Sequence, residues 1–411
     1  MSEQPALPPS GAYLPSIRDS SRAVRQAANI SITPAAIERL LFSPAFVDSY
    51  KRVSAYHGLA LPLKFSSVLD ELNLISVLSL LNFASGYRVP LHVQTGRGAW
   101  DSIRALVFSM YITSSIEDDL LSAVGMKSIQ DAKIAELMNV QLHVERPHET
   151  ISGVVVGELG GPLYDMVKLV TGVLNETGAI LSNSGYPNLG AFVAEALNEG
   201  AKAGTGKGSD FLMEFVVERL VRAFPAFRDM GLVDGKPIYC FKKALFLLHA
   251  ISVRFGTTTS HPLFPIPSTK SSPVFTDNVL PSLLIHLGVI DLSSSKLFSL
   301  FPAAGSEERL KELLGPSPST DKDAKKTMPK EGPVLTSQQS YILRAAAIDA
   351  CELIVETARS AARPESSRAR ELGWIRDITL PDLDMWIWSV AKDRPDYRAL
   401  ERFVRLDTVF F

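Results

Sequence analysis

The segment from Ser272 to Gly288 contains an acidic residue in a position that could serve chemistry. Asp277 follows Phe275 by two positions and stands before an apolar stretch that ends at Gly288. A carboxylate fixed beside a bound ligand can stabilise developing positive charge or position an attacking water. The same residues also predict a loop that enters a short helix, with Asp277 or Asn278 as its N-cap. On the residue pattern alone, the N-cap is the more frequent role for such an acid.

The elements that must position this segment are mainly helical. Apolar residues recur at helical spacing from Leu212 to Phe224, and Pro225 follows at once, which predicts an amphipathic helix that ends there. Thr336 and Gln339 form a capping-box pattern before a second apolar stripe. Pro162 opens a third helical stretch. These patterns predict a mainly α protein with few or no strands.

The chain organisation follows from composition. Residues 1–20 are rich in Pro, Ser and Gly and are expected to form a disordered arm. Residues 21–411 are expected to form a single compact helical domain. Residues 315–333 have the composition of a linker and predict an exposed insertion that is dispensable for stability and turnover. Only the tail from Phe403 to Phe411 resembles a strand.

The overall composition excludes several classes of protein. The 411 residues are 46% hydrophobic and 21% charged, which is typical of a folded globular protein. A net charge of -2 disfavours nonspecific binding to nucleic acid. Cys240 and Cys351 are the two cysteines, so a disulfide framework or Cys-rich zinc site is excluded. With no apolar run long enough for a membrane span, we expect a cytoplasmic protein that uses no metal or cofactor.

Seven segments of the chain carry a resemblance to a known family. They occur in the family's order from about residue 35 to the C-terminus, and each is short: Leu81-Asn82-Phe83; Leu174 to Gly178; Phe224-Pro225 with Phe227 to Asp229; Gly235-Lys236 with Phe241 to Ala244; Phe275, Asp277, Pro281 and His286 to Gly288; Glu352 to Ile354; Asp384 with Trp388. With these segments the chain resembles the queuosine salvage family of queuosine 5'-phosphate N-glycosylases. The resemblance implies an all-α architecture similar to that of helix-hairpin-helix DNA glycosylases.

The resemblance also implies an activity and a set of site residues. The expected reaction is hydrolysis of the N-glycosidic bond of queuosine 5'-phosphate, which releases queuine and ribose 5-phosphate for salvage of queuine into tRNA. The family's catalytic acid corresponds to Asp277 and its base-contacting aromatic to Phe275. Substrate-binding roles correspond to Asp384, His57 and, for the phosphate, Lys242.

Several of these residues have a second interpretation. Lys242 and its neighbour Lys243 fit either a phosphate site or a solvated helix face. Trp388 fits the core or a stacking platform. His57 fits either a buried, hydrogen-bonded histidine or a ligand contact.

The chain departs from the family pattern at five pocket positions. The family usually has aromatic residues at Ser85 and the following glycine, a tyrosine at Asn278, an aromatic at Met385 and an acid at Ser389. The catalytic Asp is retained, so these departures bear on the base that is accepted more than on the reaction type.

Three functions therefore compete. The first is the N-glycosylase, whose partner is a small nucleotide. We expect such an enzyme to bind neither nucleic acid nor membrane directly. The second is a catalytically altered helical binding or scaffold protein of the same fold. The third is a DNA glycosylase, against which the net charge counts. A small closed pocket that holds both Asp277 and Asp384 within reach of one ligand would support the first. An open groove lined by Lys and Arg would support the third.

Overall fold

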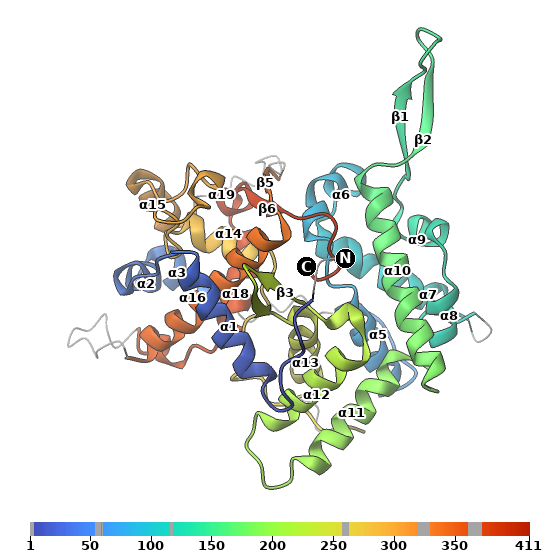
Figure 1. The fold of residues 1–411 in the computed structure, drawn as a ribbon, viewed down its shortest axis with the longest axis horizontal. Coiled ribbons are helices and arrows are strands. Elements are labelled where there is room, and N and C mark those ends of the chain that lie inside the picture. The colour runs from blue at the N-terminus through green and yellow to red at the C-terminus, as the bar shows by residue number, and fades with distance from the viewer. Residues whose placement is uncertain are drawn as a thin grey trace.

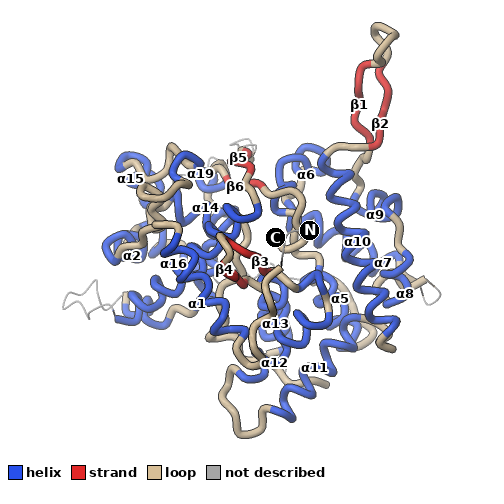
Figure 2. The backbone as a smooth tube through the Cα atoms, viewed as in Figure 1, coloured by secondary structure: helices blue, strands red, loops and turns tan. Residues whose placement is uncertain are grey.

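The structure is a computed structural model, and it describes residues 4–53, 59, 61–115, 118–256, 263–318, 329–360 and 372–411. Helices dominate it and strands are short and few (Figure 2), which confirms the predicted mainly α, compact fold. His57 lies outside the described residues, as does the middle of the predicted insertion.

The described helices are, in chain order, α1 (Tyr13–Ala27), α2 (Pro34–Leu41), α3 (Pro44–Val47), α4 (Tyr50–Val53), α5 (Val68–Leu80), η1 (Ser85–Tyr87), α6 (Arg88–Thr95), α7 (Ala99–Thr113), α8 (Ala123–Ser128), α9 (Asp131–Met138), α10 (Pro162–Asn183), α11 (Leu189–Ala203), α12 (Phe211–Ala223), η2 (Pro225–Phe227), α13 (Lys242–Phe255), α14 (Val279–His286), η3 (Phe298–Leu300), α15 (Glu307–Leu314), α16 (Ser337–Ser360), η4 (Gly373–Asp377), α18 (Leu380–Asp393) and α19 (Pro395–Arg398). The described strands are β1 (His143–Pro147), β2 (Val155–Leu159), β3 (Met230–Val233), β4 (Lys236–Tyr239), β5 (Glu331–Val334) and β6 (Arg402–Val404).

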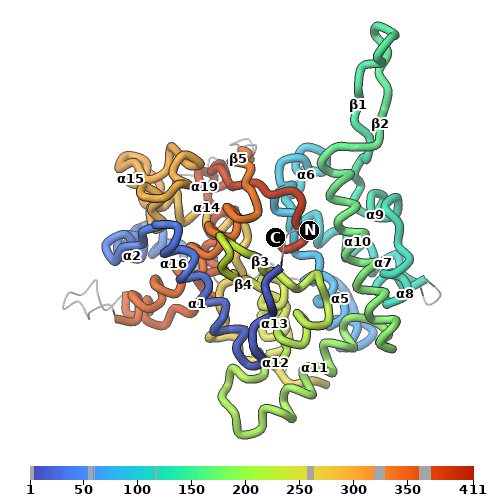
Figure 3. The backbone as a smooth tube through the Cα atoms, in the orientation of Figure 1, coloured from blue at the N-terminus to red at the C-terminus, as the bar shows by residue number. Residues whose placement is uncertain are grey.

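The two ends of the sequence fold together. Helices α1 and α2 lie against α16 near the C-terminal end of the chain (Figure 3). Helices α5 to α10 form the other side of the molecule (Figure 1), and α13 packs against α5. Residues that are far apart in sequence therefore meet where these two groups of helices face one another.

The predicted N-terminal arm is wrong for residues 13–20. Helix α1 begins at Tyr13, and its buried side chains Leu14, Ile17 and Val24 recur at helical spacing. This stripe packs against α16, and Glu214 of α12 accepts hydrogen bonds from the first backbone N–H groups of the helix. The free energy gained by burying this apolar stripe stabilises the helix, although the residues before it have a composition typical of loops.

Three helix boundaries predicted from local patterns, two starts and one end, are confirmed. Helix α10 begins at Pro162, and α12 ends at Ala223 before Pro225. At the start of α16 the capping box is complete: Gln339 N donates to Thr336 Oγ1 at 3.3 Å, and Thr336 N donates to Gln339 Oε1 at 2.9 Å. These interactions involve neighbours in the chain, so the sequence alone identifies them.

The described residues include three two-stranded sheets, none of which was predicted as a pair of strands. Of the tail Phe403–Phe411, which was expected to resemble a strand, only the first two residues belong to β6 (Arg402–Val404). The antiparallel hairpin of β1 and β2 projects from the body of the protein beyond α10 (Figure 1), and β3 and β4 form a second hairpin. Strand β5 pairs in parallel with β6. Residues 331–333 of the predicted insertion are exposed or half-exposed, as expected, but they belong to β5 and are not an unstructured linker. A Cβ on Gly332 would lie 2.4 Å from the carbonyl oxygen of Arg402, so only glycine allows this close pairing.

Among the described residues, no single helix is long and apolar enough to cross a membrane. Two successive segments, Val68–Leu80 and Ser85–Thr95, meet the length and composition requirement together, but they are bent by 68°.

Candidate active site

A cavity of about 310 Å³ is lined by residues from positions 82–101 and from several segments between 242 and 402. Its walls come from η1 and α6, from the start of α7, and from the loop before α14. Lys242 of α13, Pro329 before β5, and the region from α18 to β6 complete it. This volume is within the range of small-molecule sites.

Asp277 lies on the wall of this cavity, directly before α14. Its Oδ1 accepts a hydrogen bond from Val279 N at 2.7 Å, so one carboxylate oxygen is fixed by the first turn of the helix. The predicted short helix is confirmed, with Asn278 at the N-cap position and Gly288 just past the end in a left-handed conformation at φ 68°. Asp277 thus combines the two interpretations, because it bonds the helix start and also faces the cavity.

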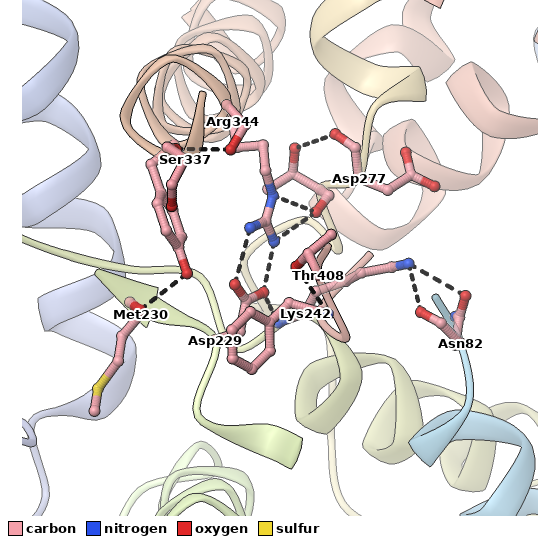
Figure 4. A network of polar contacts seen from close by, with 12 residues as sticks. Asn82, Asp229, Met230, Lys242, Asp277, Ser337, Arg344 and Thr408 are labelled. Carbon is pink, nitrogen blue, oxygen red and sulfur yellow. Dashed lines mark hydrogen bonds and ion pairs between the residues drawn. The ribbon is translucent and has the colours of Figure 1, made fainter. Parts of the chain in front are cut away.

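Lys242 reaches the same cavity from the start of α13. Its Nζ donates to the carbonyl oxygen of Asn82 at 2.8 Å and to Asn82 Oδ1 at 3.2 Å (Figure 4). Burial lowers the pKa of Lys242, and the negative charge of Asp277 opposes that effect. Lys243 is buried too, where Nζ donates to Leu80 O at 2.8 Å. The solvated-face interpretation of this pair is therefore wrong.

Asp384 and Phe275 lie behind the cavity wall, which differs from our expectation that they face the ligand. Asp384 is 4% exposed, and its Oδ2 accepts a hydrogen bond from Phe275 N at 2.6 Å. The Phe275 ring packs against Phe246 and His249, with centroids 6.1 and 5.2 Å apart. Neither residue is among those that line the cavity. Their contacts hold the backbone that carries Asp277.

Four basic side chains of the cavity were missed by the sequence analysis. Together with Lys242 they make five cations facing two carboxylates, Asp101 and Asp277; the four are Arg88, Lys392, Arg398 and Arg402. Within the described ranges none of the five forms an ion pair with a carboxylate. The cavity therefore carries an excess of positive charge, which favours an anionic ligand.

Backbone carbonyl groups hold the three arginines in place. Arg88 Nη2 donates to Lys330 O at 2.7 Å, and Arg402 Nη2 donates to Ala391 O at 2.8 Å. Arg398 donates to Lys392 O through Nε at 3.2 Å and Nη2 at 2.6 Å. These bonds orient the guanidinium groups and leave their charges without a counterion in the part of the chain that is described.

Burial disfavours the charged forms of these cations. With burial as the largest cause, the pKa is lowered to about 7 for Lys392, about 9 for Arg88 and about 10 for Arg402. The charge of Arg402 contributes to the shift at Arg88. At Arg402, Asp277 opposes the shift and Arg398 contributes to it. A bound anion would offset the repulsion among these cations and raise their pKa values.

Aromatic rings form another part of the wall. Phe83, Trp100 and Trp388 line the cavity, and the rings of Trp100 and Trp388 meet edge to face at 6.3 Å. Lys392 Nζ lies 3.3 Å from the Trp388 ring centroid, a cation–π contact. Trp386, in contrast, is a core residue whose Nε1 donates to Ser49 Oγ at 2.8 Å. The stacking interpretation thus fits Trp388 alone of these two tryptophans.

Two polar atoms at this wall lack an internal partner. Ser85 Oγ and Trp100 Nε1 are buried, and neither has a hydrogen-bond partner among the described residues. Both residues line the cavity. A ligand with polar edges would satisfy them.

The departures from the family pattern fall into two groups. Ser85 and Asn278 line the cavity, and Asn278 Nδ2 donates to Phe403 O at 2.8 Å. Met385 and Ser389 are buried in α18 away from the cavity wall. The altered contacts with a ligand are therefore those of Ser85 and Asn278.

No group of three or more His, Cys, Asp or Glu side chains is placed to hold a metal ion within the described residues. Cys240 and Cys351 are both buried with free thiols.

Comparisons with known proteins do not assign the chain to a family. No protein-family model matches the sequence, and no curated protein is significantly similar to it.

Proposed function

We propose that this chain hydrolyses the N-glycosidic bond of a 5'-phosphorylated nucleoside, with queuosine 5'-phosphate as the expected substrate. The observation that carries the proposal is Asp277, a carboxylate held on the wall of a small cavity whose other charged side chains are mostly basic. The resemblance of the seven segments supports the choice of base.

The carboxylate suits the charge that develops during the reaction. Breaking a ribosyl C–N bond makes the sugar cationic, and a negative group beside it stabilises the transition state. The bond from Val279 N fixes the orientation of Asp277, so little reorganisation is needed during the reaction. The carboxylate stabilises the ribosyl cation or orients the water that attacks it.

The rest of the cavity suits a nucleotide. Lys242, the expected phosphate ligand, lies in the cavity with three arginines and Lys392, and together these cations complement a dianionic phosphate. Trp388 and Phe83 offer apolar surfaces for a planar base, and Ser85 Oγ and Trp100 Nε1 offer polar groups to its edge. Queuine is a 7-deazaguanine and lacks the N7 that other purines protonate, so contacts of this kind must assist its departure.

A helical binding protein remains the alternative function. The same cavity would bind the nucleotide, and the replacements at Ser85 and Asn278 would prevent turnover. Affinity without product release distinguishes this alternative from the enzyme.

The test is incubation of the purified chain with queuosine 5'-phosphate and detection of queuine by mass spectrometry. Queuosine without phosphate and guanosine 5'-phosphate serve as matched controls for the phosphate and the base. We expect queuine release from queuosine 5'-phosphate and little from either control. Binding without release under all conditions would favour the alternative.

A further inference from the structure

A buried ion pair connects the backbone segments that carry Asp277 and Lys242. Arg344 of α16 and Asp229, between η2 and β3, are both 0% exposed. Arg344 Nη1 donates to Asp229 Oδ1 at 2.8 Å, and Nη2 donates to Oδ2 at 2.5 Å (Figure 4). Such a two-pronged pair fixes both direction and distance.

The arginine end of the pair holds the residue before Asp277. Arg344 Nε and Nη2 both donate to the carbonyl oxygen of Thr276, at 3.1 and 3.0 Å. The Phe411 ring covers the guanidinium group, with its centroid 4.4 Å away. The backbone immediately before Asp277 is thus tied to α16.

The aspartate end holds the start of α13. Asp229 Oδ2 accepts from Lys242 N at 3.2 Å, and Asp229 O accepts from Cys240 N at 2.9 Å and from Phe241 N at 3.2 Å. Phe241 has a left-handed backbone at φ 47°, which is costly for a residue with a Cβ. These three bonds hold the strained turn from which Lys242 enters the cavity.

We infer that Arg344 and Asp229 are positioning residues, which set the placement of Asp277 relative to Lys242 in the active site. The pair is buried away from the cavity wall, and its two charges have opposite effects on the pKa of Lys242. We therefore assign its role to geometry rather than to a net field in the pocket. The inference rests on the proposed role of Asp277, because a positioning role has meaning only if Asp277 acts on a ligand.

The first test is Arg344→Lys, which keeps the positive charge and removes the planar fork. A displacement of reacting groups by about 1 Å can cost about 100-fold in rate, so we expect kcat to fall by about that factor. KM for queuosine 5'-phosphate should change by less than about threefold, because the cations and rings of the cavity remain. Amide hydrogen exchange at residues 276–280 should become faster.

Asp349→Asn is the matched control on the same helix. Asp349 is buried and pairs with Arg22 and Arg25 of α1, away from the cavity. We expect this variant to lose melting temperature as Arg344→Lys does, with kcat per folded molecule and exchange at residues 276–280 unchanged. If Arg344→Lys behaves like Asp349→Asn, the pair is merely structural and the inference is overturned.

A second variant covers the case in which Arg344→Lys does not fold. The double variant Arg344→Met with Asp229→Leu replaces both charges by apolar side chains, an exchange that buried ion pairs often tolerate. We expect it to fold and to show the same loss of kcat; wild-type kcat would overturn the inference.

Failure of the proposed function can be distinguished from failure of this inference. If the wild type releases no queuine, the proposed function fails. Unchanged exchange at residues 276–280 in these variants would instead overturn the inference.

Discussion

Asp384 Oδ2 accepts a hydrogen bond from the backbone N–H of Phe275, with 2.6 Å between the two atoms. This bond joins α18 to the loop that carries Asp277. The pKa of Asp384 is raised to about 7, chiefly by burial. The Phe275 N–H and Lys242 oppose this rise, and the negative charge of Asp277 adds to it. The carboxyl group is thus harder to ionise in the folded chain than in the unfolded one.

Asp384 should make the protein less stable as the pH rises. The unfolded chain releases this proton near the ordinary pKa of Asp, about 4, and the folded chain releases it near 7. The stability contribution of the protonated group is therefore complete below about pH 4 and is lost as the pH rises through 7. In Asp384→Asn the pH-independent amide can still accept from Phe275 N. We compare the free energy of unfolding of this variant with that of the wild type. The difference should favour the variant by on the order of 1 to 3 kcal/mol more at pH 8 than at pH 4. Urea unfolding at both pH values measures the difference, and equal pH dependence in the two proteins would contradict the assignment.

Asp277→Asn should abolish chemistry and preserve binding. The amide oxygen can still accept from Val279 N, so the start of α14 should remain intact. Loss of one preorganised charge costs about 3 to 4 kcal/mol of barrier, so queuine release should fall by roughly 100-fold to 1000-fold.

Asp291→Asn is the matched control for that variant. Asp291 Oδ1 accepts from Ser293 N at 2.8 Å, the same two-residue geometry as that of Asp277, but in an exposed loop. Its turnover should equal that of the wild type. Wild-type release by Asp277→Asn would leave Asp277 with only its capping role.

Arg88→Gln should weaken selection for the 5'-phosphate. A hydrogen bond to a charged group contributes about 1.5 to 3 kcal/mol, so kcat/KM for queuosine 5'-phosphate should fall by about 10-fold to 100-fold. The value for unphosphorylated queuosine should not change. Arg97→Gln, an exposed neighbour that does not line the cavity, controls for the lost charge. An equal loss for both substrates would place the phosphate elsewhere.

Gly332→Ala should disturb the cavity through its backbone. The added Cβ would meet the carbonyl oxygen of Arg402 at 2.4 Å, so β5 and β6 must separate. We expect a loss of about 1 to 3 kcal/mol in the free energy of unfolding, together with a higher KM for the nucleotide. This expectation replaces the view that all of residues 315–333 are dispensable.

Gly172→Ala provides the comparison, because a Cβ at this position in α10 meets no atom within 4 Å. It should be neutral or slightly stabilising, as alanine favours a helix over glycine. Melting temperature and KM measured on both variants separate the clash from the general effect of the substitution. Equal values for the two would show that the strand pairing does not shape the site.

Local signals in the sequence identified the elements that depend on neighbouring residues. The bonds of Thr336 and Gln339 and the proline at the start of α10 are of this kind. Helix α1 had a usable signal as well, since Leu14, Ile17, Ser21 and Val24 recur every three or four positions. The composition of residues 1–20, rich in Pro, Ser and Gly, led us to expect disorder in spite of that pattern.

The cationic side of the cavity had no such signal. Arg88 and Arg402 come from distant segments and share one cavity only because β6 lies beside η1. The pairing of Arg344 with Asp229 depends on the same long-range packing. The expectation that Asp277 and Asp384 share one pocket is met for Asp277 alone, because α18 packs behind the loop and directs Asp384 to Phe275 N instead.

The pairing of β5 with β6 also constrains how the chain acquires its site during synthesis. The ribosome releases Lys242 and Asp277 well before it adds Arg398 and Arg402, and β5 has no partner strand until β6 has been made. A nascent chain that stops within α18 therefore carries the carboxylate but lacks part of the cationic wall. The proposed nucleotide site can therefore be complete only when translation is nearly finished.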